Sequence, residues 1–489
     1  MFRVCRTKGL FVLFNSTSFL VFLPIVFLLY WFVFNKSLTW QNILILIASY
    51  VFYGGWSERF LLLLIGSTLL DYLYGFGVGS SDKTKSKFFL WLSIINNLGI
   101  LGIFKYYNFF ALQFQQAFEA AGIHTNPVFL QIALPVGLSF YTFHGMSYVF
   151  DIYRGVRKPV TNFVDYSVFV SFFPLLVAGP IERANHLLPQ VQSKRTFKYS
   201  QAVEGCRLIL WGLFKKVVIA DSLAVIADQI FNNYQDYNAF TLLIGAVAFA
   251  FQIYGDFSGY SDIALGTAKL FGFELLSNFK FPYFSRNIAE FWRRWHISLS
   301  SWFKDYLYIP LGGSRKGKAR AVVNTFIIFL VSGFWHGASW NFITWGFIHA
   351  CGFLPLLLLN RNRQYISDVV AQSSSLPTIK EAFQMLSTFA FVTFAWIFFR
   401  SESLRSAWGY VQQIIISTIE SPKQFFTLPQ GLSSFAYILP LLIIDWNFRH
   451  NERQLLFKNV WYKNLFYIGL GILILFYFGK RNSFIYFQF

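Results

Sequence analysis

The sequence predicts an all-α polytopic membrane protein. Hydrophobic residues make up 55% of its 489 residues and charged residues only 13%, whereas an ordinary soluble protein carries about a quarter charged residues. Apolar runs long enough to cross the ~30 Å hydrocarbon core of a bilayer recur along the chain. Between them lie short connections rich in Lys and Arg, which is typical of loops on the cytoplasmic side of a membrane.

We expect about 11 transmembrane helices with additional re-entrant or interfacial helices, all in a single membrane domain over residues 1–489. The clearest helical segments lie at residues 19–34, 43–53, 60–76, 88–104, 129–149, 164–178, 208–227, 240–253, 322–334, 340–359, 386–399, 435–444 and 465–478. Residues 1–14 begin with a basic stretch but lack a small-residue cleavage site, so we interpret them as an N-terminal extension. The predicted location is the cell inner (cytoplasmic) membrane.

Residues 286–304 follow a different pattern. At about 100° per residue, their aromatic and aliphatic side chains fall on one arc and their charged side chains on the other. We therefore expect one amphipathic helix in the membrane interface, with its aromatic face in the lipid and its charges among the headgroups.

The net charge of +19 does not indicate nucleic-acid binding. The basic residues gather in short loops at residues 83–87, 154–158, 194–198, 315–320 and 361–363, beside the expected anionic lipid surface, and no basic soluble domain is present. The three cysteines are widely spaced and form no metal-type pair. We expect no metal and no bound cofactor.

Two histidines inside apolar sequence, His296 and His336, are the main candidates for catalysis. Hydrocarbon disfavours ionisable side chains, and imidazole is suited to moving protons near neutral pH. A helix that begins after the basic loop at residue 321 would rise about 22 Å before reaching His336, whereas an interfacial His296 would stay near the cytoplasm. We therefore expect the pair to mark two depths of one channel rather than one compact dyad.

The tetrad at residues 335–338, Trp-His-Gly-Ala, sets His336 between a large ring and two small residues. Small residues permit the close approach of a backbone or of a narrow ligand. A neutral imidazole there is suited to deprotonate an acceptor hydroxyl during acyl transfer. Ser339 is expected to share a helix face with His336, and we interpret it as bonded to the carbonyl one turn back. His349, further along, is interpreted as a core residue.

Two aspartates, Asp256 and Asp262, lie among small and hydroxyl residues in a predicted helix. The sequence leaves three roles open for them. They orient a histidine, they bind a cation, or they pair with Arg286, Arg293 or Arg294 and hold the interfacial helix. We favour the pairing role, because buried carboxylates need a charged or hydrogen-bonding partner.

Long stretches of the chain, starting near residue 15, resemble the membrane-bound O-acyltransferase (MBOAT) superfamily, and within it the bacterial alginate O-acetyltransferase group. The resemblance rests on FNSTSFLVFL near the start, LILIASYVFYG at 44–54, LPVGLSFYTFHGMSYVFDIYRG at 134–155, SFFPLLVAGPIER at 171–183, YGDFSGYSDIALG, NFKFPYFSRNIAEFWRRWHISLSSWFKDYLYIPLGG, FWHGASWNFITWG and the closing FIYFQF. His144 departs from the family pattern, because relatives carry glutamine there.

The resemblance implies a ring of membrane helices around a tunnel, with His336 as the essential histidine and His296 as the histidine of the RRWHISLS block. It also implies transfer of an acyl group, usually from cytoplasmic acetyl-CoA, toward an extracytoplasmic polysaccharide with the help of a periplasmic esterase-like (SGNH) partner. The lipid bilayer is a further expected partner, and nucleic acid is not. The residues predicted to line the tunnel or contact substrate are Trp335, Gly337, Asn341, Asp256, Asp262, Arg293, Arg294, Lys304, Asp305 and Tyr306.

Two other functions remain open at this point. One is D-alanyl transfer to a teichoic-acid-like polymer, because a relative with that activity shares the fold. The other is a proton-coupled transporter in which the histidines relay protons. The sequence shows no internal repeat of the kind found in many transporters, so acyl transfer is the preferred hypothesis.

Overall fold

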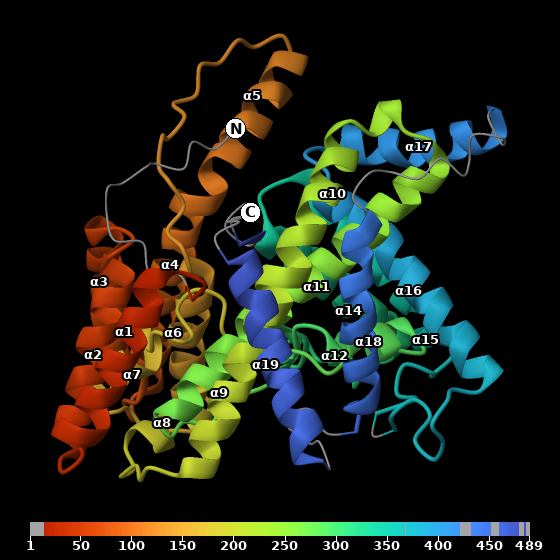
Figure 1. Ribbon diagram of the computed structural model, residues 1–489. Helices are drawn as coiled ribbons and strands as arrows, with labels where there is room; N and C mark the ends of the chain where they lie inside the picture. The colour runs from red at the N-terminus through yellow and green to blue at the C-terminus, as the bar shows by residue number, and fades with distance from the viewer. Residues whose placement is uncertain (1–13, 367, 421–431, 451–458, 479–483, 486–489) are drawn as a thin grey trace. The chain divides into compact units, whose positions relative to one another are not determined.

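A computed structural model describes residues 14–366, 368–420, 432–450, 459–478 and 484–485. All regular structure in these residues is helical (Figure 1), which confirms the predicted all-α class. The chain forms two compact units, one of residues up to 206 with 264–276, and one of residues 207–263 with 277 onward. The predicted extension at residues 1–14 lies almost wholly outside the described residues.

The first unit contains a bundle built on three helices, α3, α4 and α6, which pack side by side (Figure 1). Its helices are α1 (Thr17–Leu28), α2 (Leu38–Gly54), α3 (Glu58–Val78), α4 (Lys83–Leu101), α5 (Tyr107–Ala120), α6 (Leu138–Tyr153), α7 (Phe163–Ser171), α8 (Ala184–Val191) and the start of α9 (Tyr199–Leu213). Between α3 and α4, the buried Asp71 carboxylate accepts hydrogen bonds from Ser93 at 2.7 Å and Asn97 at 2.8 Å. These donors offset the cost of burying the carboxylate.

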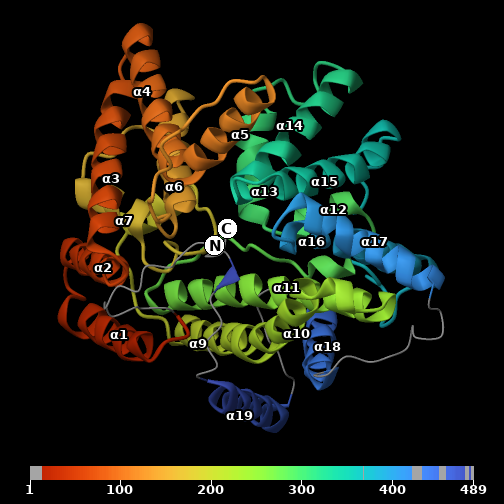
Figure 2. The same cartoon turned by 90° about the horizontal axis from the view of Figure 1, so that it is seen from above.

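The second unit carries both candidate histidines. Its helices are α10 (Asp221–Asn232), α11 (Ala239–Leu270, which ends in the first unit), α12 (Ile288–Arg294), α13 (Ile297–Phe303), α14 (Lys318–His336), α15 (Trp340–Leu358), α16 (Ile379–Arg400), α17 (Leu404–Glu420), α18 (Ile438–Asn447) and α19 (Val460–Tyr477). Helices α14 and α15 form an antiparallel hairpin and lie side by side (Figure 2). Gly333 and Gly346 lie at their crossing, where each glycine faces a backbone carbonyl of the other helix.

Short helical turns interrupt or join these helices. Those of the π type are η1 (Leu29–Val33), η2 (Gly102–Tyr106), η3 (Phe214–Ala220) and η6 (Lys304–Tyr308), and those of the 3-10 type are η4 (Tyr234–Asp236), η5 (Pro282–Phe284) and η8 (Leu432–Tyr437). A π-helical turn widens a helix locally and changes which side chains face inward. η3 is such a turn, and every one of its residues is buried.

Within the described residues, seven helices are long and apolar enough to cross a membrane. They are Glu58–Val78, Lys83–Ala120, Ala239–Leu270, Lys318–His336, Trp340–Leu358, Ile379–Arg400 and Val460–Tyr477. Two shorter apolar helices lie at Thr17–Val33 and Leu38–Gly54. The expected number of about 11 crossings is larger because some apolar runs form only short helices. The run at 164–178, for example, yields the nine-residue α7.

The single interfacial helix predicted over residues 286–304 is wrong. Helix α12 ends at Arg294, and α13 begins at Ile297. His296, between them, adopts a left-handed conformation with φ 44°. The aromatic face packs inside the protein, with Phe291 and Trp295 each only 1% exposed. The periodicity of the pattern was visible, but it reports an apolar face and does not say whether lipid or protein covers that face.

Candidate active site

His296 and His336 lie next to each other, with their ring centroids 6.4 Å apart. His336 is the last residue of α14, and His296 occupies the turn between α12 and α13. Both are buried, with His336 4% and His296 1% exposed. The prediction that the pair marks two separate depths is therefore wrong. It failed because the segment that carries His296 is a broken helix inside the protein rather than a helix at the membrane interface.

Aromatic rings surround both imidazoles. His336 contacts Trp335, Trp345 and Phe399, with ring centroids at 4.9, 5.2 and 5.3 Å. Phe257 of α11 meets the His296 ring at 4.7 Å. This environment excludes water and disfavours the charged form of an imidazole. Burial lowers the pKa of His296 to about 3, so its ring is neutral at physiological pH.

The turn at His296 is held by the segment of residues 278–280. The backbone N–H of Ile297 donates to the Asn278 carbonyl at 3.0 Å, and the N–H of Lys280 donates to the Arg294 carbonyl at 3.0 Å. A left-handed conformation is uncommon for a residue other than glycine, and such residues are concentrated at functional sites. Two hydrogen bonds that flank the turn therefore fix the backbone position from which the His296 side chain projects. Sequence reasoning missed Asn278, whose only signal was a polar residue at the start of an apolar, Pro-containing stretch.

The predicted neighbours of His336 have mainly packing roles. Trp335 is buried and lies edge-on to both histidines. The ring of Phe342 occupies the space beside Gly337, so this glycine admits an aromatic ring of the same protein. Asn341 donates to the Ser401 carbonyl at 2.7 Å and ties the start of α15 to the end of α16. Ser339 precedes α15, outside the helix that ends at His336, and its hydroxyl bonds to Asn341. The expectation that Ser339 shares a helix face with His336 is therefore wrong.

The two aspartates of α11 pair with lysines. Asp262 lies 2.7 Å from the Lys215 Nζ, and Asp256 lies 2.6 Å from the Lys216 Nζ. Lys216 also contacts Asp221 at 2.9 Å. The predicted pairing with the arginines of residues 286–294 is therefore wrong, although each aspartate does pair with a basic side chain. The missed signal was the Lys-Lys dipeptide within the apolar run at 208–227, where each lysine requires a buried counter-charge.

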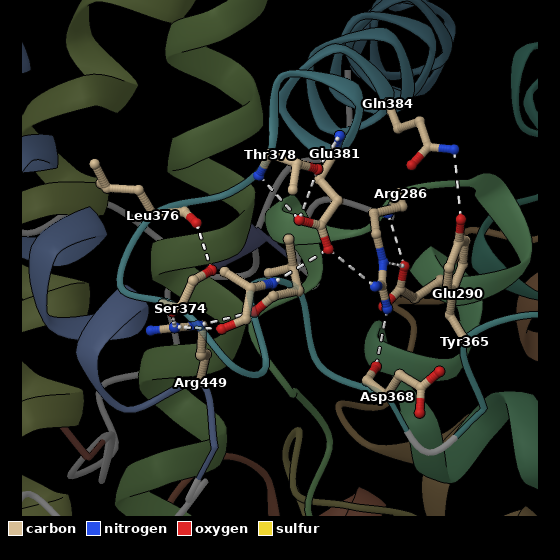
Figure 3. A network of polar contacts seen from close by, with 12 residues as sticks. Arg286, Glu290, Tyr365, Asp368, Ser374, Leu376, Thr378, Glu381, Gln384 and Arg449 are labelled. Atoms are coloured by element: carbon tan, nitrogen blue, oxygen red, sulfur yellow. Dashed lines mark hydrogen bonds and ion pairs between the residues drawn. The ribbon is translucent and has the colours of Figure 1, made fainter.

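The arginines of this segment instead hold a loop. Arg286 pairs with Glu290 at 3.1 Å and with Glu381 at 3.3 Å (Figure 3). Arg294 also pairs with Glu290, at 2.8 Å. Arg293 and Arg294 donate to backbone carbonyls of the loop between α15 and α16. Their guanidinium groups are therefore committed to structural contacts, because planar bidentate donors satisfy several carbonyls at once.

The three remaining predicted residues, Lys304, Asp305 and Tyr306, lie on η6, directly after α13. Lys304 is exposed, and the Tyr306 ring packs against Trp302 at 5.1 Å. Their place in the reaction stays a prediction.

Two further buried histidines have structural partners. His349 is fully buried, and its Nδ1 accepts the Trp292 indole N–H at 3.3 Å. In the first unit, the Nε2 of His144 accepts the backbone N–H of Glu182 at 3.1 Å. The amide oxygen of a glutamine would accept the same bond, so the departure from the family pattern at His144 preserves the contact.

Comparison with known proteins places the chain in a family. A sequence model described as "MBOAT, membrane-bound O-acyltransferase family" matches residues 156–374, which include both histidines. The chain is similar to the probable alginate O-acetylase of Pseudomonas aeruginosa, at 39% identity over 400 residues, which cover 81% of this chain and 74% of the relative. The corresponding protein of Pseudomonas putida is 41% identical over 401 residues, covering 81% and 79%. A peptidoglycan O-acetyltransferase of Helicobacter pylori is 35% identical over 426 residues, covering 81% and 78%. With its helical membrane architecture and its buried histidine pair, the chain belongs to the membrane-bound O-acyltransferase family and is an O-acyltransferase.

Proposed function

We propose that this protein transfers an acetyl group from cytoplasmic acetyl-CoA toward hydroxyl groups of an extracytoplasmic polysaccharide, with His336 as the general base. The observation that carries the proposal is the pair of buried imidazoles, 6.4 Å apart and enclosed by aromatic rings. Relatives named for O-acetylation of alginate and of peptidoglycan support a sugar hydroxyl as the acceptor. They do not distinguish one polysaccharide from another.

In the proposed reaction, the His336 imidazole accepts the proton of the acceptor hydroxyl. The oxygen then attacks the thioester carbonyl, and the carbonyl electron pair moves onto its oxygen. When the tetrahedral intermediate collapses, the C–S bond breaks, and the thiolate takes the proton from the imidazolium. The step is balanced without a metal or a redox cofactor. Excluding water from the aromatic surroundings of the two histidines would protect the thioester from hydrolysis and strengthen electrostatic interactions there.

His296 is the second functional imidazole in this proposal. Because burial lowers its pKa to about 3, it acts as a neutral hydrogen-bonding group and not as a cation. Its strained backbone and the aromatic contacts of its ring hold it beside His336. It would orient the acceptor or the acyl group in the geometry that the reaction needs.

The remaining parts of the proposal concern location and partners. The protein resides in the cytoplasmic membrane, where acetyl-CoA reaches it from inside the cell. In this proposal the acceptor hydroxyl at His336 belongs either to the polymer itself or to an esterase-like protein on the outer side, which then passes the acetyl group to the polymer. The basic loops between the helices support the assumed orientation, because Lys-rich and Arg-rich connections remain on the cytoplasmic side.

The test compares His336→Ala with the wild type, using acetyl-CoA and measuring both acetyl transfer by purified protein and ester content of the cell-surface polysaccharide. Loss of a general base lowers the rate by about 10²–10⁴-fold, so ester formation should disappear while protein level and membrane insertion persist. His124→Ala is the matched control, because His124 is exposed. Full ester content in the His336→Ala strain would refute the assignment. Proton-coupled solute uptake without acetyl transfer would instead support the transporter.

A further inference from the structure

Asn278 lies directly beside the His296 turn and is 1% exposed. Its backbone carbonyl accepts the Ile297 N–H at 3.0 Å, and its side-chain Oδ1 accepts the Ser298 hydroxyl at 2.6 Å. Within the part of the chain that the structure describes, the Nδ2 of Asn278 has no hydrogen-bond partner. The side chain therefore presents a buried amide donor at the turn that carries a site histidine.

Such a donor is costly if it serves only structure. Leaving a buried polar group unsatisfied costs about 1–3 kcal/mol, and most buried polar groups in folded proteins have a partner. The structural contacts of Asn278 use only its two oxygen atoms. If Asn278 only anchored the turn, its two oxygen atoms would be sufficient. Its amide N–H groups are therefore available to a ligand.

The reaction proposed above requires a donor of this kind. When the acceptor oxygen attacks the thioester, negative charge develops on the carbonyl oxygen of the acyl group, and preorganised N–H groups stabilise that charge in a dry site. The described neighbours of the histidine pair are mainly aromatic. An amide fixed at its oxygen end is a rigid, neutral donor, and it does not compete for the proton that the imidazole carries.

We propose that the Asn278 amide donates a hydrogen bond to the acyl carbonyl oxygen and stabilises the oxyanion of the tetrahedral intermediate. This inference rests on the proposed acyl transfer at His336. The bond strengthens as the C=O π electrons move onto oxygen, and it weakens again when the C–S bond breaks and the carbonyl re-forms. Asn278 transfers no proton, so the balance of the step is unchanged.

The decisive variant is Asn278→Asp, which keeps an oxygen for the Ser298 hydroxyl and removes the amide donor. Removing one oxyanion donor lowers kcat by about 10²–10³-fold, and KM for acetyl-CoA should change little. Activity relative to wild type should recover as the pH falls, because the protonated carboxyl of this variant regains a donor. A purely structural role would not produce that pH profile.

Ser298→Ala is the matched control, because it removes the bond to the Asn278 oxygen and leaves the amide donor in place. It should retain kcat within a few-fold per folded protein. If Asn278→Asp retains wild-type kcat while His336→Ala is inactive, the inference is refuted and the proposed function stands. If His336→Ala is also active, the proposed function fails first. Parallel loss of kcat and thermal stability in both Asn278→Asp and Ser298→Ala, without recovery at low pH, would assign Asn278 to structure and also refute the inference.

Discussion

The crossing of α14 and α15 positions His336, and its geometry allows a quantitative prediction. A β-carbon added at Gly333 would lie 3.0 Å from the carbonyl carbon of Phe342 and closer still to its oxygen. The obstacle is backbone, so no side-chain rotation relieves it. The two helices must separate by about 1 Å to restore a van der Waals contact. His336 lies one turn beyond Gly333, and its ring partner Trp345 lies one turn beyond Phe342.

Gly333→Ala should therefore affect catalysis more strongly than folding. Overpacking costs about 1–3 kcal/mol of stability, whereas a 1 Å displacement of a catalytic group can lower the rate about 100-fold. The assay measures acetyl transfer per folded protein beside a thermal melt in the same detergent. Gly471→Ala is the control, because a β-carbon there meets no atom within 4 Å, and alanine favours the helix. A Gly333→Ala protein with wild-type kcat would show that this crossing does not set the position of His336.

Three further predictions concern burial. Glu290→Ala should destabilise the protein by about 3–5 kcal/mol, because it leaves the buried Arg286 without its main carboxylate. A thermal melt should show a smaller loss of stability for Glu290→Gln, and equal melting temperatures of the two variants would contradict this. His144→Gln should keep the bond to the Glu182 N–H and have a melting temperature close to that of the wild type. His144→Leu should lose about 1–3 kcal/mol of stability, and equal losses in the two variants would show that the bond is unimportant. The buried neutral His296 has a folded pKa of about 3 against about 6.5 when unfolded. Its contribution to stability is therefore complete above pH 6.5 and lost as the pH falls toward 3, by up to about 1.4 kcal/mol per pH unit. In His296→Gln, the free energy of unfolding should therefore fall less steeply between pH 6.5 and 4 than in the wild type. Denaturation curves measured at several pH values give this dependence, and an unchanged slope would contradict the assignment.

Some features of this protein could be predicted from local sequence. Composition indicated the helical membrane class, because a chain with so few charges cannot cover a soluble surface. The Trp-His-Gly-Ala tetrad made His336 a candidate for catalysis, because a histidine flanked by small residues in an apolar run is unusual without a function, and that role stays a prediction. The apolar arc of residues 286–304 marked side chains that are buried, although the single interfacial helix predicted from it is wrong. The last two signals each lie within a few turns of chain, whereas composition is a property of the whole sequence.

The arrangement of the site depended on contacts between distant segments. Residues 286–304 break at His296, where the backbone of the segment around Asn278 bonds to both sides of the turn, and the His296 ring centroid lies 6.4 Å from that of His336. In the same way, Asp256 takes Lys216 as its partner because the π-helical turn η3 brings that lysine to 2.6 Å from it. Periodicity describes which face of a helix is apolar, but only packing decides what covers that face and which charges meet. The sequence by itself thus determined the class of the protein and named both candidate histidines, whereas only the tertiary structure determined that their rings lie side by side.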